Sequence, residues 1–142
     1  MIILDTNVVS ELIKDTPDPA VRAWANSQPR HALLSTSITV MELRAGVEKQ
    51  LQSRRRQELE AGIDWALSDL LGGRVLDFDR RAAFAAAEWF GYCRRIGRPR
   101  QTTDVQIAGI AICRNIPLAT RDVDGFAGIR VKLINPWSTA AN

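Results

Sequence analysis

Short apolar runs recur along the chain and alternate with longer amphipathic stretches. Several of these runs fit buried strands, because each is apolar almost throughout and too short to form a helix of its own. They are residues 1–4, 32–36, 75–78, 117–120 and 131–134. Strands of this kind are typical of a parallel sheet whose two faces are covered by helices.

The stretches between these runs carry helix-start and helix-stop signals. Asp18-Pro19 places a capping residue before a proline at the first helical position, and Gly72-Gly73 ends an amphipathic stretch. Ser37 and Asp79 are expected to cap two further helices. The predicted helices are residues 8–13, 19–27, 37–50, 54–71, 79–96 and a stretch that begins at 102 or 103. The resulting order of strands and helix pairs predicts an α/β fold with a parallel sheet.

Length and composition favour an ordinary globular protein. With 142 residues, of which 46% are hydrophobic and 25% charged, the chain is expected to form a single domain over residues 1–142. No apolar stretch approaches the roughly 20 residues needed to span a bilayer, and no basic segment precedes Asp5, so no signal peptide is expected. Two cysteines, Cys93 and Cys113, and one histidine, His31, argue against a disulfide scaffold or a zinc site. We therefore expect a cytoplasmic protein without membrane association.

Arginine dominates the positive charge. The chain has 19 basic and 16 acidic residues, a net charge of +3, and only three of the basic residues are lysines. Arginine suits phosphate recognition, so a nucleic acid is a possible partner, although a compositional bias explains the count equally well. Arg98, Arg100 and Arg121 are candidate RNA contacts. The alternative is a solvated helix face for Arg98 and Arg100, and an ion pair inside the protein for Arg121. For the run Arg54-Arg55-Arg56, a solvated helix face is the favoured interpretation.

Four carboxylates stand where a parallel sheet usually binds its ligands, beyond the carboxyl ends of the strands. Asp5 ends the first strand, and Asp122 closely follows the fourth. Glu42 lies about one turn into the helix after the second strand, and Asp104 lies in the first turn of its helix. Each acid alone fits a helix cap, a turn or a solvated face. Together they are expected to converge at one edge of the sheet.

A convergent acidic cluster restricts the chemistry. Clustered carboxylates repel one another unless some are protonated or a cation lies among them. Oxygen donors without His or Cys suit Mg²⁺ or Mn²⁺. Such an ion lowers the pKa of a bound water and neutralises charge on a phosphodiester, so the pattern predicts a metal-dependent nuclease.

Several motifs of this chain, in their order, resemble those of PIN-domain ribonucleases. They are Leu4-Asp5-Thr6-Asn7, the stretch SITVMELRAG at residues 37–46, Thr103-Asp104 with the helix that follows, and Ala119-Thr120-Arg121-Asp122 with Phe126. The ending Ile134-Asn135-Pro136-Trp137 is similar to the FitB-type branch of the VapC toxins. The resemblance covers essentially the whole chain.

The resemblance implies a three-layer α/β/α sandwich with a central, mainly parallel sheet. It also implies Mg²⁺- or Mn²⁺-dependent hydrolysis of RNA with water as the nucleophile. Asp5, Glu42 and Asp104 match the central acids of the family, and Asp122 matches a fourth, with Asp124 as a weaker candidate on the same loop.

The same resemblance assigns supporting residues and partners. Thr6, Asn7 and Thr120 match residues that support the acids. It implies a toxin–antitoxin system in which a homodimer is held inactive by a cognate antitoxin, whose tail lies across the active-site groove. Operator DNA is then bound only through the antitoxin, and the RNA substrate is a tRNA or an rRNA.

Two other interpretations stay open at the level of sequence. An aspartate-nucleophile phosphohydrolase needs a second acid two residues after Asp5, where this chain has Asn7, and none of its lysines is an obvious catalytic residue. A non-catalytic RNA- or protein-binding module with a residual metal site is the second alternative. An Asp104→Asn variant that leaves RNA processing unchanged would favour that module.

Overall fold

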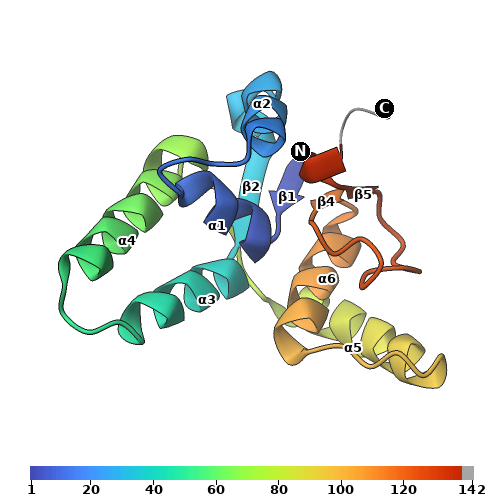
Figure 1. Ribbon diagram of the computed structural model, residues 1–142. Helices are drawn as coiled ribbons and strands as arrows, with labels where there is room; N and C mark the ends of the chain where they lie inside the picture. Colours follow the sequence, from blue (N-terminus) through green and yellow to red (C-terminus); the bar gives the residue numbers. More distant parts are fainter. Residues whose placement is uncertain (139–142) are drawn as a thin grey trace.

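The computed structural model, which describes residues 1–138, contains a sheet in the order β3-β2-β1-β4-β5 (Figure 1). Every neighbouring pair of strands is parallel. The strands are β1 (Ile2–Leu4), β2 (Leu33–Thr36), β3 (Val75–Leu76), β4 (Leu118–Ala119) and β5 (Leu133–Ile134). The predicted parallel sheet is therefore confirmed. Because β1 lies between β2 and β4, the ends of these three strands meet at the middle of one sheet edge.

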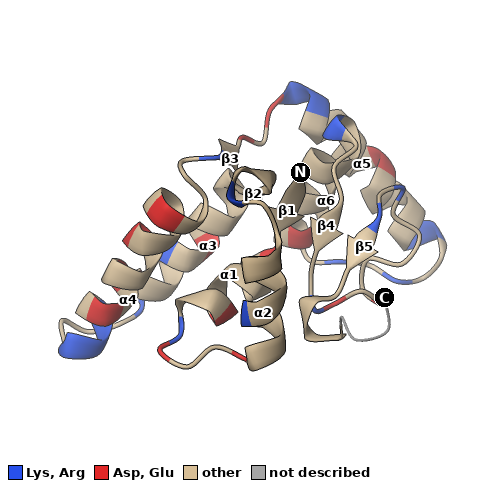
Figure 2. Ribbon diagram, turned by 90° about the horizontal axis from the view of Figure 1, so that it is seen from above, with Lys and Arg blue, Asp and Glu red and all other residues tan. Residues whose placement is uncertain are grey.

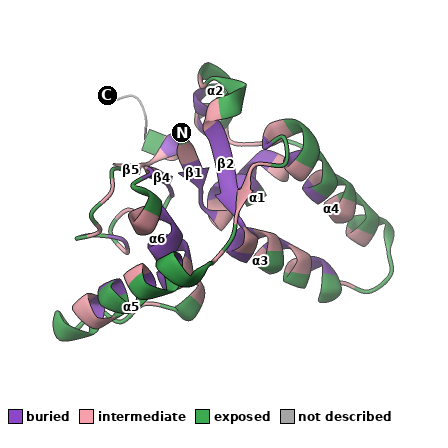
Figure 3. Ribbon diagram, turned by 180° about the vertical axis from the view of Figure 1, so that it is seen from behind, coloured by how far each residue is buried: buried purple, intermediate pink, exposed green. Residues whose placement is uncertain are grey.

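Helices cover both faces of the sheet, as predicted. They are α1 (Thr6–Ile13), α2 (Pro19–Ser27), α3 (Ser37–Glu48), α4 (Arg54–Trp65), α5 (Arg80–Arg95) and α6 (Thr102–Arg114). Ile3, Leu34 and Leu118 pack with α5 and α6, whereas Leu4 and Ala119 pack with α1, α2, α3 and α4. Figure 3 shows the buried strands β1 and β2 between these two groups of helices. The arrangement is a three-layer α/β/α sandwich.

Side-chain caps fix where several helices begin. The Asp79 carboxylate accepts a hydrogen bond from the backbone of α5, as expected. The predicted cap of α3 is wrong by one residue, because Thr36 Oγ1 accepts from the Thr39 N–H at 3.1 Å. The Ser37 hydroxyl instead accepts from the Phe78 N–H at 3.3 Å. This tertiary contact draws Ser37 away from its own helix end.

The predicted helix over residues 54–71 is not a single α-helix. Regular α-helical bonding stops at Trp65, and the π-helical segment Ala66–Leu70 follows. The Leu71 N–H donates to the Ala66 carbonyl at 2.9 Å, one residue farther back than in an α-helix. Leu71 is buried in the core between the sheet and α4. The predicted strand over 75–78 is also shorter, ending at Leu76.

Close packing of α6 on α5 places the first turn of α6 at the sheet edge. Gly109 makes this approach possible, since a Cβ there would collide with the Ala82 carbonyl and the Ala86 side chain of α5. α6 begins without a side-chain cap, and Asp104 lies in its first turn. The α5–α6 pair thus determines where Asp104 is held relative to β1.

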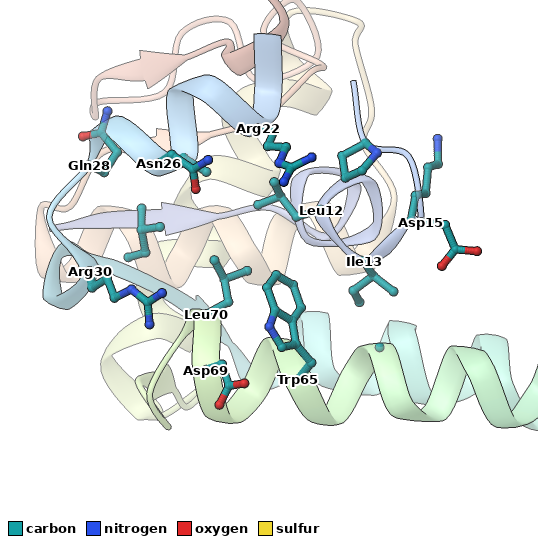
Figure 4. Close-up of a pocket in the computed structure, with 15 residues that line it drawn as sticks. Leu12, Ile13, Asp15, Arg22, Asn26, Gln28, Arg30, Trp65, Asp69 and Leu70 are labelled. Atoms are coloured by element: carbon teal, nitrogen blue, oxygen red, sulfur yellow. The ribbon is translucent and has the colours of Figure 1, made fainter. Parts of the chain in front are cut away.

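A cavity of about 480 Å³ opens between α1, α2 and the end of α4 (Figure 4). Trp65 and Leu70 point toward Leu12 of α1, and Arg22 and Asp69 add charge to its wall. None of the four candidate acids lines this cavity. Within residues 1–138, no helix combines the length and the apolarity that a membrane crossing requires.

Candidate active site

Asp5 and Thr120 meet because β1 and β4 are adjacent and parallel. Each residue directly follows the last residue of its strand. The Thr120 hydroxyl donates to Asp5 Oδ2 at 2.7 Å, and Asp5 Oδ1 accepts from the Thr6 N–H at 2.8 Å. Asp5 is only 5% exposed. A buried carboxylate therefore combines helix capping with a position at the sheet edge.

Glu42 is held by a chain of threonine hydroxyls. Thr6 Oγ1 donates to Glu42 Oε1 at 2.7 Å, and Thr39 Oγ1 lies 2.9 Å from Thr6 Oγ1. Thr36 Oγ1 in turn donates to Thr39 Oγ1 at 3.4 Å. A supporting role is predicted from the sequence for Thr6, but not for Thr36 or Thr39. The position of Thr39, one helical turn before Glu42, was the available signal.

Asn7 links the first helix to the loop after β4. Its side-chain amide donates to Thr120 Oγ1 at 3.4 Å and its carbonyl accepts from the Arg121 N–H at 3.3 Å. The Asp122 N–H also donates to Thr120 Oγ1, at 3.1 Å, and Asp122 Oδ1 accepts from the Gly125 N–H at 3.1 Å. These contacts hold the loop against Asp5. They also leave an amide, not a carboxyl, where an aspartate-nucleophile phosphohydrolase requires its second acid.

Asp104 and Asp122 are bridged by one arginine. Nη2 of Arg100 lies 3.0 Å from Asp104 Oδ2 and 2.6 Å from Asp122 Oδ2. The side chains are partly buried, with exposed fractions of 21% for Arg100, 26% for Asp104 and 49% for Asp122. Arg100 therefore neutralises part of the acidic site from within the chain.

The pKa values show that the acids share one electrostatic environment. Burial is the main cause that raises the pKa of Asp5 from 3.8 to about 6, and the charges of Asp104 and Glu42 act in the same direction. Hydrogen bonds from Thr120 and Thr6 lower the pKa of Asp5 and only partly offset these effects. Burial thus disfavours the ionised form of Asp5, and the negative charges of Asp104 and Glu42 add to this effect.

Asp104 shows the same effect despite its arginine partner. Burial raises the pKa of Asp104, Arg100 lowers it, and the charges of Glu42 and Asp122 raise it again. Asp104 thus interacts electrostatically with Asp5, Glu42 and Asp122 at the sheet edge, and Asp5 also interacts with Glu42.

The donor chemistry of these acids fits a hard divalent cation. Carboxylate oxygens are the usual ligands of Mg²⁺ and Mn²⁺, and a cation would relieve the repulsion between Asp104 and its neighbouring carboxylates. The acids do not converge as tightly as predicted, because no three His, Cys, Asp or Glu side chains among residues 1–138 form a group able to hold a metal ion. Threonine hydroxyls hold Asp5 and Glu42, and Arg100 holds Asp104 and Asp122. Every one of the four carboxylates thus already has a partner in the protein, and Asp104 and Asp122 share theirs.

The other candidate arginines contact groups of the protein. Arg98 Nη2 donates to the Asp124 carbonyl at 3.1 Å, which leaves Asp124 tied to the loop through its backbone. The Arg121 guanidinium lies 5.0 Å from the centre of the Trp137 ring, within range of a cation–π interaction. Both arginines lie beside the acidic site and keep charged nitrogens available at its rim.

The run Arg54-Arg55-Arg56 lies elsewhere, at the outer start of α4 (Figure 2). Arg54 pairs with Glu58 at 3.2 Å, and Arg56 pairs with Glu60 at 3.1 Å along the same helix. Arg54 and Arg55 are exposed, as the predicted solvated helix face requires, whereas the Arg56 side chain is only 15% exposed and also donates to the Gln50 carbonyl at 2.9 Å.

Comparison with known proteins identifies the family. The family model described as PIN domain matches residues 2–132. The chain is 37% identical to the VapC ribonuclease Y4jK of Sinorhizobium fredii, over 99% of this chain and 100% of that protein. It is 34% identical to the toxin FitB of Neisseria gonorrhoeae, over 96% of this chain and 99% of that protein. The structure of FitAB bound to an IR36 DNA fragment superposes with a TM-score of 0.86 at 34% identity, covering 96% of each chain.

The α/β/α sandwich agrees with these matches in sequence and in structure, which extend over almost the whole chain. The chain therefore belongs to the PIN-domain family, in the branch that contains the VapC and FitB toxins.

Proposed function

We propose that this protein is the ribonuclease toxin of a type II toxin–antitoxin system and hydrolyses RNA phosphodiester bonds with the help of Mg²⁺ or Mn²⁺. The observation that carries the proposal is the group of four acids at the carboxyl edge of a parallel sheet, in which Asp104 is electrostatically coupled to Asp5, Glu42 and Asp122. The ribonuclease name of a relative that is 37% identical over 99% of this chain supports the substrate class.

Asp5, Glu42, Asp104 and Asp122 are the residues that would hold the cation. A bound Mg²⁺ or Mn²⁺ would supply a water of lowered pKa and neutralise charge on the phosphodiester. Asp5 is the most rigid of the acids, since both of its oxygens accept hydrogen bonds and its side chain is buried.

Thr6 and Thr120 orient the acids through their hydroxyls, and Asn7 secures Thr120. Such supporting residues commonly change metal affinity or activity by about 10- to 100-fold when they are lost. Arg98 and Arg121 lie beside the site and are proposed to attract the phosphates of a tRNA or rRNA substrate.

The partners follow from the relatives and are part of the proposal. A FitAB complex bound to DNA superposes on this chain, which supports a cognate antitoxin that carries the toxin to operator DNA. We propose a cytoplasmic homodimer that this antitoxin inhibits.

The test uses the toxin freed of any partner protein and a pool of total small RNA. Cleavage is measured with Mg²⁺ or Mn²⁺ and with EDTA, for the wild type, Asp104→Asn and the control Asp64→Asn, which makes the same change on the exposed side of α4. The expected result is discrete cleavage that requires the ion, disappears in Asp104→Asn and persists in Asp64→Asn.

Two results would refute the proposal. Cleavage that is equal in EDTA or in Asp104→Asn would exclude the metal-dependent acidic site. A folded wild type that binds RNA, but does not bind metal and does not cleave the RNA, would favour a non-catalytic binding module.

A further inference from the structure

Contacts with an aromatic ring and a close-packed loop position Arg100 between the two acids that it bridges. Its guanidinium lies 5.5 Å from the centre of the Phe126 ring, and Phe126 stacks on Trp89 with ring centres 5.6 Å apart and planes 10° apart. Gly125 allows the loop to pass close by, because a Cβ there would collide with Arg100 and Asp122. The aromatic stack and the glycine thus leave room for one guanidinium and pack against it.

The hydrogen bonding of Arg100 is nevertheless incomplete. Its two ion pairs both use Nη2, and its buried Nε has no hydrogen-bond partner among residues 1–138. A guanidinium carries five N–H donors and stays charged at any physiological pH. Arg100 is therefore a permanent cation with spare donors, and its ion pairs in the acidic site are those with Asp104 and Asp122.

We infer that Arg100 is a built-in counter-ion, which occupies the place of a cation between Asp104 and Asp122 in the metal-free protein and which a divalent ion must displace. The inference rests on the proposed metal-dependent function. Nη2 donates to Oδ2 of both acids, and its positive charge repels a divalent ion at these oxygens, so metal ligation there favours withdrawal of the guanidinium. Metal binding therefore costs both ion pairs, and Arg100 sets the concentration of metal that the toxin needs.

Displacement would also give Arg100 a second use. A withdrawn guanidinium on the Phe126 ring remains beside the site, with parallel N–H donors suited to a phosphate group. The same side chain would then protect the metal-free site from its own repulsion and contact the RNA backbone in the loaded enzyme.

The matched comparison is Arg100→Gln against Arg98→Gln. Both variants remove one positive charge from the same loop, but Arg98 makes its hydrogen bond to a backbone carbonyl and forms no ion pair with the acids. Mn²⁺ affinity is measured by calorimetry on the partner-free toxin without RNA, after circular dichroism confirms folding. We expect Arg100→Gln to bind Mn²⁺ about tenfold more tightly than the wild type, equivalent to about 1.4 kcal/mol. Arg98→Gln, which keeps both ion pairs of Arg100, should change Mn²⁺ affinity much less than Arg100→Gln does.

A second measurement uses the wild type alone and does not depend on how a variant folds. Mg²⁺ is titrated into labelled toxin while the arginine Nε–H signals are followed by NMR. The Arg100 signal should shift on metal binding, because its charged end leaves the two acids. The Arg54 signal, from a pair on the outer end of α4, serves as the control and should stay unchanged.

The possible failures can be told apart. The displacement of Arg100 is overturned if Arg100→Gln binds Mn²⁺ no more tightly than the wild type, or if the Arg100 signal does not shift when Mg²⁺ binds. Either result is compatible with the proposed metal site. A folded wild type that binds neither ion overturns the proposed metal site and this inference together.

Discussion

Replacing Asp5 by asparagine separates the function of this carboxylate from its structural role. The carboxamide oxygen of Asn can still accept from the Thr6 N–H, so the cap of α1 survives. The hydroxyl of Thr120 loses its acceptor at Oδ2, which costs about 1 kcal/mol. The substitution also removes the negative charge of Asp5, which burial and the neighbouring acids disfavour.

The magnitude follows from the pKa of Asp5. Raising a carboxyl pKa from 3.8 to about 6 on folding corresponds to about 3 kcal/mol of disfavoured ionisation. The Asp5 carboxyl stays protonated to a higher pH in the folded protein than in the unfolded chain. Its contribution to the free energy of unfolding is therefore complete below pH 3.8 and is lost as the pH rises through about 6. The wild type should therefore lose stability over that range relative to Asp5→Asn.

The assay is urea unfolding of the metal-free proteins in EDTA at pH 4 and pH 8. The free energy of unfolding of Asp5→Asn minus that of the wild type should rise by about 2–3 kcal/mol between these pH values. Asp64→Asn, on the exposed side of α4, controls for the substitution itself. A difference that does not change with pH, or a large loss of stability at pH 8, would refute the reasoning and make Asp5 mainly a helix cap. Mn²⁺ binding and RNA cleavage should be lost in the same variant.

Two further substitutions test how the site is held. Thr6→Val removes the hydroxyl that donates to Glu42 and should lower RNA cleavage by about 10- to 100-fold with little change in the unfolding midpoint, so unchanged cleavage rates would contradict the orienting role. Gly109→Ala places a methyl group against the Ala82 carbonyl and should cost about 1–3 kcal/mol in urea unfolding. Gly46→Ala in α3, where nothing lies within 4 Å, should be neutral or stabilising, and an equal loss in both variants would exclude the close contact of α5 with α6 as the cause.

Much of the fold was predictable because it depends on residues that are close in sequence. The order of strands and helices follows from short apolar runs and helical periodicity, and Asp79 caps α5 with an N–H only three residues away. The errors arise where a distant segment intervenes. Ser37 fails to cap α3 because Phe78 reaches it from another strand region, and residues 66–70 widen into a π-helix where Leu71 enters the core.

The candidate acids were also predictable, since parallel strands place the residues after their ends at one edge of the sheet. How each acid is held could not be derived in this way. The hydroxyl chain through Thr39 and the bridging of Asp104 to Asp122 by Arg100 join segments that are far apart in sequence. Periodicity and capping report only local interactions, so the sequence by itself determined the elements and the acidic character of the site. The tertiary structure decided which partner each carboxylate has and how much charge the site leaves uncompensated.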